Sequence, residues 1–524
     1  MRWSQKIKKN REIIFLSLIL LLAFFLRFWR LSSIPPGLYP DVAVNGTDAI
    51  KSLNTGKFPV FYPANNGREG FFINLIAFSF YLFGISIWSI RVVAALFGFL
   101  TVLGIYLLGK ELFNQKIALF ASFFLAVCFW HLNFSRIGFR AIVLPFVLVY
   151  SFYFLFRGLR TKKWISFILG GAIFGLGFHT YISWRLSPMI LALWVIYKII
   201  RNKSFFFQYW KKLLFFVLFS FLTALPLLYY FYLNPADFMG RAGDVSVFKE
   251  PNFVKIILLN SLKALGMFNF FGDFNWRHNL AGAPMFDIIL GILFLGGLIL
   301  SLKIIFGKNN KRNGSQRDIF IFLILWFLIM LLPTILSNEG IPHALRALGV
   351  IPVSLIFAAY FLNFLLEKKF WSNYKPKTKI IFVSLILILI FILEFNRYFI
   401  VWANHPSTHG AFTEDLGNIG NYFNHLGHNV VKYVLVNDGG VIVDGWPMPI
   451  QTIKFVTYNK SFPKFLTPED IKKINYLPSP SVVAFLKRDD NLLKYLKNKF
   501  PSGREEVIDL KPGYNTQFYA FIKE

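Results

Sequence analysis

Apolar runs of about 20 residues recur along most of this chain. Each run is long enough to cross a hydrocarbon core of about 30 Å as a helix. In lipid, a helix satisfies all of its own backbone hydrogen bonds, so such runs are read as membrane helices. Only 16% of the 524 residues are charged, against roughly a quarter in a typical soluble protein. The sequence therefore predicts an all-α polytopic membrane protein.

The apolar runs predict about eleven membrane spans. They lie near residues 13–28, 88–108, 117–134, 142–156, 165–181, 186–200, 213–233, 285–305, 319–336, 345–366 and 380–400. The stretch Phe71–Phe83 is shorter than these. We expect it to lie in the interface or to re-enter, as an interfacial helix in the first outer loop.

The distribution of basic residues supports that reading of Phe71–Phe83. If this stretch does not cross, all the basic loops fall on one side of the membrane, as the positive-inside rule requires. These loops lie near residues 6–11, 110–116, 157–163, 198–212, 308–317 and 368–379. The formal net charge of +30 is then explained by orientation and not by nucleic acid. The prediction is a multi-pass protein of the cell inner or plasma membrane, with a cytoplasmic N-terminus and an extracytoplasmic C-terminus.

Two ends of the chain differ from the apolar middle. The first run follows a basic start and is longer than a signal peptide core, so we expect an uncleaved first span. Residues 401–524 contain no further apolar run and alternate strand and turn signals. We expect two domains, a transmembrane domain over 1–400 and a small extracytoplasmic α/β domain over 401–524. Strands are predicted in VVKYVLV and PSVVAFL, and helices in LTPEDIKKI, with Thr467 at the cap, and in NLLKYLKNKF.

The segment Pro40–Gly70 is the first polar stretch long enough to hold a site. It carries Asp41, Arg68 and Glu69 in a chain with few acidic residues. An aspartate after proline is often only a turn or helix cap. The length of the loop, and arginines on other outer loops, favour a functional carboxylate at Asp41.

Arginines at the outer ends of spans depart from the usual depletion of basic residues there. Single arginines in such places often only extend toward the interface. As a set they suit a phosphate group, because guanidinium groups bind phosphate oxygens at two points. The candidate residues for binding a substrate are Arg68, Glu69, Arg136, Arg140, Arg185 and Arg346.

Other signals of chemistry are weak. The eight histidines match no metal-binding motif and the single cysteine, Cys128, has no partner for a disulfide. The sequence also lacks a Walker loop, a dinucleotide fingerprint and a nucleophile elbow. We therefore expect no metal, no cofactor and no binding of nucleic acid.

Several motifs together resemble a family of membrane enzymes. IPPGLYPDVAVNGTDA, WHLNFSRIGFRAIVLP and TYISWRLSP are similar to the bacterial relatives of the protein mannosyltransferases. These are GT-C-type glycosyltransferases, which also include the aminoarabinose transferase of lipid A. The resemblance covers the first 200 residues well and Pro342–Phe361 fairly.

The resemblance implies transfer of a monosaccharide, a mannose-like hexose or a pentose, from a polyprenyl-phosphate donor, with inversion. The acceptor is a hydroxyl group of a protein, lipid or glycan at the extracytoplasmic face, and Asp41 matches the aspartate that acts as general base. The family commonly has Asp-Glu there, whereas this chain has Val42. Two alternatives remain open: a transporter or flippase of a lipid-linked glycan, and a non-catalytic envelope assembly protein.

Overall fold

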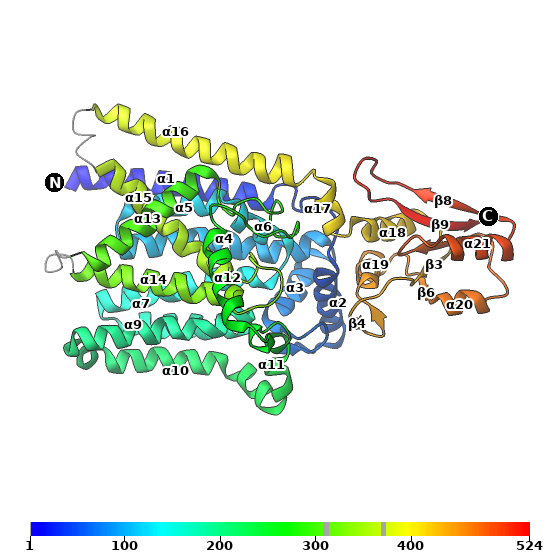
Figure 1. Cartoon of the computed structure of the whole chain (residues 1–524), viewed down its shortest axis with the longest axis horizontal. Helices are drawn as coiled ribbons and strands as arrows, with labels where there is room; N and C mark the ends of the chain where they lie inside the picture. Colours follow the sequence, from blue (N-terminus) through cyan, green and yellow to red (C-terminus); the bar gives the residue numbers. More distant parts are fainter. Residues whose placement is uncertain (1, 308–313, 368–373) are drawn as a thin grey trace.

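The computed structural model describes residues 2–307, 314–367 and 374–524. Long helices lie side by side in one body, and a smaller mixed domain covers one end of it (Figure 1). The N-terminus lies at the opposite end of the body from that domain. Parts of two predicted basic loops, at 308–313 and 368–373, lie outside the described residues.

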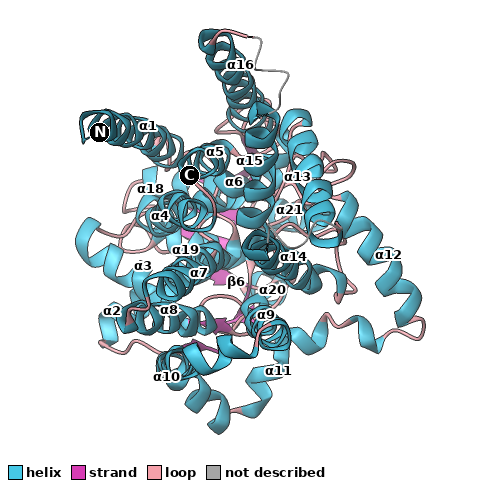
Figure 2. Ribbon diagram, turned by 90° about the vertical axis from the view of Figure 1, so that its left-hand side faces the viewer, coloured by secondary structure: helices cyan, strands magenta, loops and turns pink. Residues whose placement is uncertain are grey.

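The helical body is built from α-helices of very different lengths (Figures 1 and 2). In chain order they are α1 (Arg2–Phe28), α2 (Pro40–Thr55), α3 (Gly70–Phe83), α4 (Ile87–Leu112), α5 (Gln115–Val127), α6 (Phe129–Ile137), α7 (Val143–Thr161), α8 (Trp164–Leu176), α9 (Ser187–Arg201), α10 (Lys203–Leu233), α11 (Pro235–Asp244), α12 (Phe253–Gly266), α13 (Ile288–Phe306), α14 (Gly314–Ile335), α15 (Ile351–Glu367) and α16 (Pro376–Phe395). Short 3-10 turns are η1 (Arg140–Ile142), η2 (Gly177–His179), η3 (Ile182–Leu186), η4 (Val247–Lys249) and η5 (Leu348–Val350), and α16 continues as a π-helix, η7 (Asn396–Trp402).

Eight helical segments among the described residues are long and apolar enough to cross a membrane, or nine if the bent pair α5 and α6 is one span. The other two predicted spans correspond to α1 and to the shorter apolar helix Trp164–His179. The predicted multi-pass helical architecture is therefore confirmed. Helix α3 has 14 residues, so it is about 21 Å long and shorter than a membrane core of about 30 Å.

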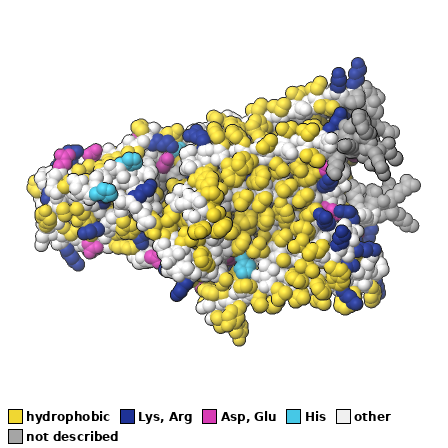
Figure 3. Space-filling model, turned by 180° about the vertical axis from the view of Figure 1, so that it is seen from behind, with side chains coloured by type: hydrophobic (Ala, Val, Ile, Leu, Met, Phe, Trp, Pro, Cys, Tyr) yellow, Lys and Arg dark blue, Asp and Glu magenta, His cyan; other side chains and the backbone are white. Residues whose placement is uncertain are grey.

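The surface of the helical body agrees with a membrane setting. Hydrophobic side chains form a broad band over the helices on the face drawn in Figure 3. On that face, Lys and Arg side chains gather at the end of the body away from the C-terminal domain. An exposed apolar band of this size is typical of a membrane interaction surface.

Glycines bring several helices into close backbone contact. On α8, a Cβ at Gly171 would lie 2.1 Å from the Phe216 carbonyl oxygen, and one at Gly175 would lie 2.0 Å from the Ser220 carbonyl oxygen. This small-xxx-small spacing is a common packing device between membrane helices, because it lets two backbones approach. It explains why α8 and α10 pack along much of their length.

The C-terminal domain is a three-layer α/β unit. Its elements are α17 (Pro406–Ala411), α18 (Glu414–His425), β3 (Val431–Leu435), β4 (Ile442–Val443), β5 (Trp446–Pro447), α19 (Pro449–Thr457), β6 (Lys464–Leu466), α20 (Pro468–Lys473), β7 (Ser481–Phe485), α21 (Asp490–Lys499), β8 (Gly503–Ile508) and β9 (Phe518–Lys523). The main sheet has the order β6-β3-β7-β9-β8. Strands β6, β3 and β7 are parallel, and β9 runs antiparallel to β7 and to β8.

Alternating side chains of the sheet form two apolar layers. Val434 packs toward α18 and α19 on one face, and Tyr433 and Leu435 pack toward α20 and α21 on the other. The predicted strands and helices of this domain are all confirmed, including the Thr467 capping box. The predicted boundary after residue 400 falls inside η7, so the division at 400/401 stays a proposal.

Gly175→Ala is expected to destabilise the helical body, because the new Cβ would meet the Ser220 carbonyl oxygen at 2.0 Å. Overpacking of this kind costs about 1–3 kcal/mol, and it should lower the thermal unfolding midpoint of the protein in detergent. Gly266→Ala is the matched control, since a Cβ there meets only the Phe270 ring at 3.9 Å. Equal midpoints for the two variants would contradict the close approach of α8 and α10.

Candidate functional site

A cavity of about 590 Å³ opens in the helical body at the end that faces the C-terminal domain. It is large enough for a small ligand, since such sites usually measure about 300–1,000 Å³. Its lining brings together six of the seven residues predicted from the sequence, which are Asp41, Arg68, Glu69, Arg140, Arg185 and Arg346. Segments more than 300 residues apart along the chain therefore meet in one place.

Asp41 lies in the first turn of α2, which begins at Pro40 after the extended residue Tyr39. A carboxylate is favoured there by the helix dipole. Asn65 donates a hydrogen bond to Asp41 Oδ1 at 2.5 Å. Asp41 is half-buried and forms no ion pair among the described residues, so it remains available as a base.

Arg68 is buried and satisfied by groups on α2. Its guanidinium group donates to Asp48 at 2.5 Å and to Asn45 at 2.9 Å. Burial lowers the pKa of Arg68, and burial likewise raises the pKa of Asp48 against the opposing effect of the Arg68 charge. The two residues thus form a paired unit that fastens the strands β1 (Phe61–Tyr62) and β2 (Arg68–Glu69) to α2.

Glu69 and Arg140 form a second pair across the cavity wall. Arg140 Nε lies 2.7 Å from Glu69 Oε2, and the two side chains are 22% and 5% exposed. This contact joins β2 to η1. Glu69 is therefore neutralised, which makes it less available than Asp41 as a base.

Arg185 and Arg346 differ in their partners. Arg346 pairs with Glu339 at 2.9 Å and donates to Ser337. Arg185 donates to the Phe238 carbonyl oxygen and its guanidinium group lies 4.4 Å from the Phe238 ring centroid. Within the described part of the chain, Arg185 has no carboxylate partner.

Arg136 does not belong to this cavity. Its side chain is fully buried and donates to the carbonyl oxygens of Leu26, Trp29 and Ile34. It also lies over the ring of Phe399 at 5.3 Å. Both terminal nitrogens of Arg136 already donate to backbone carbonyls, and the residue is absent from the cavity lining. The predicted binding role therefore gains no support, and we propose a structural role for Arg136 instead.

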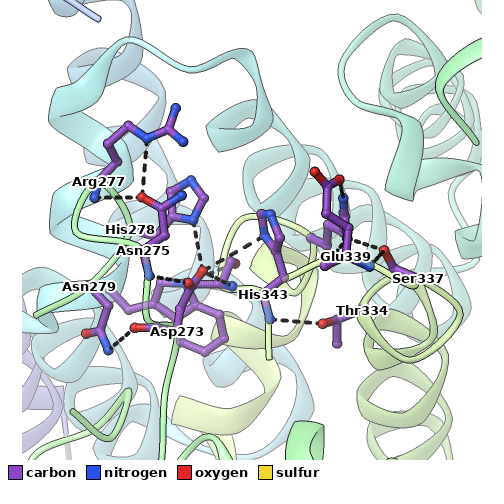
Figure 4. Close-up of polar contacts among 12 residues, drawn as sticks. Asp273, Asn275, Arg277, His278, Asn279, Thr334, Ser337, Glu339 and His343 are labelled. Carbon is purple, nitrogen blue, oxygen red and sulfur yellow. Dashed lines mark hydrogen bonds and ion pairs between the residues drawn. The ribbon is translucent and has the colours of Figure 1, made fainter. Parts of the chain in front are cut away.

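The structure also assembles a cluster that the sequence did not reveal (Figure 4). Asp273, His278 and His343 place their donor atoms within 4.8 Å of one another, a spacing that could hold a metal ion. Asp273 and His278 are near neighbours in the chain, but His343 comes from a distant loop, so a spacing motif could not find the whole cluster. Of the three, His343 lines the cavity.

Hydrogen-bond donors of the protein already bind the carboxylate of this cluster. Asp273 Oδ2 accepts from His278 Nδ1 and from the Ala344 backbone N–H, both at 2.8 Å. Burial alone would raise the pKa of Asp273, but the His278 hydrogen bond and the neighbouring imidazoles bring it below its ordinary value. Burial lowers the pKa of His343 far below its ordinary value. The cluster therefore acts as a hydrogen-bonded link between two loops, and the absence of a metal stays a prediction.

Another unforeseen pair stands beside Asp41. The Arg277 guanidinium group lies 3.9 Å from the centroid of the Tyr39 ring and points away from Asp273 (Figure 4). Burial, followed by the nearby charge of Asp41, raises the pKa of Tyr39. Arg277 therefore adds positive charge at the end of the site that holds Asp41.

Val42 occupies the position at which the Asp-Glu motif would have its second acidic residue. Its side chain is 1% exposed, and its Cγ1 lies 3.1 Å from where a Cβ on Gly138 would stand. Glutamate at this position would place a carboxylate in a tightly packed apolar contact. The start of α2 accordingly supplies one carboxylate to the site, and the other two carboxylates of the lining, Glu69 and Asp237, come from other segments.

Comparison with solved structures identifies the fold. ArnT from Cupriavidus metallidurans bound to undecaprenyl phosphate matches with a TM-score of 0.54 and 13% identity, over 97% of both chains. The Archaeoglobus fulgidus oligosaccharyltransferase in its apo form matches with a TM-score of 0.52 and 14% identity, over 96% of this chain and 70% of that one. The chain has the GT-C glycosyltransferase fold. The predicted fold class is confirmed.

Sequence comparison supports the same GT-C assignment over a shorter stretch. Residues 71–230 match the model of the dolichyl-phosphate-mannose-protein mannosyltransferase family. The Bacillus subtilis (strain 168) protein named "Putative mannosyltransferase YkcB" is 29% identical over 202 residues. That match covers 36% of this chain and 27% of the relative. The family match contains Arg140 and Arg185 but begins only after Asp41, so the assignment of Asp41 rests on position and chemistry.

Arg140→Met is expected to destabilise the protein by about 3 kcal/mol, because removing one partner leaves Glu69 as a buried unpaired charge. Denaturant or thermal unfolding in detergent would measure the loss. The double variant Glu69→Gln/Arg140→Met should be more stable than Arg140→Met alone, since the unpaired charge is gone. Strict additivity of the two single losses would contradict a coupled pair.

Proposed function

We propose that the protein is an inverting glycosyltransferase that moves a monosaccharide from a polyprenyl-phosphate donor to an acceptor hydroxyl group. One observation carries the proposal: a single cavity joins Asp41, which is unpaired among the described residues, to a set of arginines. The GT-C fold supports it, and the ArnT structure is bound to undecaprenyl phosphate. A mannose-like hexose or a pentose is the proposed sugar.

The arginines divide into paired and unpaired charges. Arg68, Arg140 and Arg346 each have a carboxylate partner, whereas Arg185 has none in the described part of the chain. An unpaired guanidinium group in a partly apolar cavity is a strong site for phosphate. We assign the donor phosphate to Arg185, with Arg346 as a supporting cation in the same lining.

The apolar part of the cavity suits the lipid portion of such a donor. Phe238, Phe248 and Leu336 line the same cavity as Arg185 and Arg346. Phe248 is 60% exposed and Phe238 is 38% exposed, so this part of the cavity continues onto the apolar surface. A polyprenyl chain would leave the phosphate in that direction and enter the bilayer.

The proposed reaction uses Asp41 as the general base. The acceptor oxygen attacks the anomeric carbon from the face opposite the phosphate, and Asp41 takes the hydroxyl proton. The bond between the anomeric carbon and the phosphate oxygen breaks, and the electron pair leaves with polyprenyl phosphate. The configuration at the anomeric carbon inverts. The Asn65 hydrogen bond holds the carboxylate in place, and the arginines stabilise the charge on the leaving phosphate.

The proposed orientation follows from charge. The cavity lies at the end of the helical body that carries the C-terminal domain, and Lys and Arg gather at the other end on the face of Figure 3. The positive-inside rule places the basic end in the cytoplasm. We therefore propose an inner or plasma membrane protein with its site, its acceptor and its C-terminus on the extracytoplasmic side. Nucleotide sugars are cytoplasmic, which favours a lipid-linked donor.

Asp41→Asn is expected to lower transfer by roughly 10²–10⁴-fold, because general base catalysis is lost. Reconstituted protein with a polyprenyl-phosphate monosaccharide and a hydroxyl acceptor would measure product formation. Asp490→Asn is the control, since that side chain is 72% exposed on the C-terminal domain. Wild-type turnover by Asp41→Asn in folded, membrane-inserted protein would refute the assignment.

Arg185→Gln is expected to raise the KM for the donor at least tenfold, because the cation assigned to its phosphate is removed. Steady-state kinetics with varied donor and fixed acceptor would show the change. Arg504→Gln serves as the control, since Arg504 is a 59% exposed residue of strand β8. An unchanged donor KM in Arg185→Gln would assign the phosphate to another residue.

A further inference from the structure

We propose that the C-terminal domain is a positioning element for Asp41, acting through the backbone carbonyl of Leu38. The inference rests on the proposed function of Asp41 as the base. It gives the C-terminal domain a part in the reaction although that domain contributes no residue to the cavity lining.

Two threonines of the C-terminal domain bind the same carbonyl group. Thr452 Oγ1 of α19 donates to the Leu38 carbonyl oxygen at 2.9 Å, and Thr413 Oγ1 donates to it at 3.4 Å. Leu38 is 1% exposed and Thr452 is fully buried. Leu38 stands three residues before Asp41, so these bonds set the point from which α2 begins.

The helix that carries Asp41 is held between the two domains. A Cβ at Gly46 of α2 would lie 2.6 Å from the Phe455 ring of α19 and 2.9 Å from Ile90 of α4. Val44 forms a small buried cluster with Val443 and Met448 of the C-terminal domain. Only glycine at position 46 leaves room for α4 and α19 to press on the same turn of α2.

The segment before α2 is fixed from the opposite side as well. Gly37 has a φ of +58°, and a Cβ there would lie 2.6 Å from the Phe412 carbonyl oxygen of the C-terminal domain. The Gly37 carbonyl oxygen accepts from the buried Arg91 side chain of α4 at 2.7 Å. The segment therefore lies between a guanidinium group of the helical body and the backbone of the C-terminal domain.

The exact position of the Asp41 carboxylate matters for the reaction, because a misplacement of about 1 Å can lower the rate about a hundredfold. A hydroxyl group that fixes Leu38 should therefore affect turnover more than folding. The matched test compares two buried threonines of α19. Thr452 bonds across the domain contact, whereas Thr457 donates to Ile453 of its own helix at 2.8 Å.

The experiment measures Thr452→Val, Thr452→Ser and Thr457→Val in the full-length reconstituted protein, beside wild type and Asp41→Asn. The readouts are kcat, the donor KM, the thermal midpoint, and hydrogen–deuterium exchange of a peptide that covers residues 38–45. We expect Thr452→Val to lower kcat about tenfold with little change in KM. Its midpoint should match that of Thr457→Val, and exchange over 38–45 should rise.

The conservative variant and the control decide the outcome. Thr452→Ser keeps the hydroxyl group and should restore kcat and exchange, and Thr457→Val should leave both near wild type. Equal kcat and equal exchange in Thr452→Val and Thr457→Val would overturn the positioning role. If wild type itself transfers no sugar, or Asp41→Asn is fully active, the proposed function fails instead. Exchange then still decides whether the C-terminal domain holds the start of α2.

Discussion

Buried guanidinium groups bound to backbone carbonyl groups hold together the end of the helical body that faces the C-terminal domain. Arg91 donates to the carbonyl oxygens of Leu31, Ser32, Pro35 and Gly37, and its side chain is 1% exposed. Arg136 binds the carbonyl oxygen of Leu26 in the last turn of α1 and those of Trp29 and Ile34 in the same connection between α1 and α2. A buried charge is costly unless it is hydrogen-bonded, and an irregular backbone near the membrane leaves carbonyl groups that need donors. The buried guanidinium groups and the backbone carbonyl groups therefore satisfy each other's hydrogen bonds.

This connection determines where the site can form. With residues 26–37 held in place, α2 begins at a defined position and presents Asp41 in its first turn. Strands β1 and β2 then fasten to α2 through Arg68 and Asp48, and η1 fastens to β2 through Arg140 and Glu69. The cavity is thus lined by charges that are mostly paired. Asp41 and Arg185 have no ion-pair partner among the described residues, and these are the two that the proposed chemistry uses. Asp237 also lines the cavity without an ion pair in the described part of the chain, but it accepts a hydrogen bond from Tyr230.

The C-terminal domain belongs to the same framework. Helix α2 packs against α3 of the helical body and against α19 of the C-terminal domain, so both domains contact it. The likeness to ArnT extends over 97% of both chains at only 13% identity. The architecture of the whole chain is therefore shared with a distant relative although few side chains are, which is expected when a fold depends on apolar pattern and helix packing. Functional residues must be argued one by one in such a case.

The sequence alone determined the membrane architecture, the strands and helices of the C-terminal domain, and six residues of the cavity. These features follow from local patterns, which are apolar runs of span length, alternation of apolar residues, helix caps and charged residues at the ends of spans. Only the tertiary structure decided what each arginine does. Arg136 and Arg140 are four residues apart, yet one turns inward to carbonyl groups and the other reaches Glu69. The cluster of Asp273, His278 and His343, the Arg277–Tyr39 contact and the Thr452–Leu38 bond were equally invisible in the sequence. Each joins segments that meet only after the chain has packed, and no local spacing records such contacts.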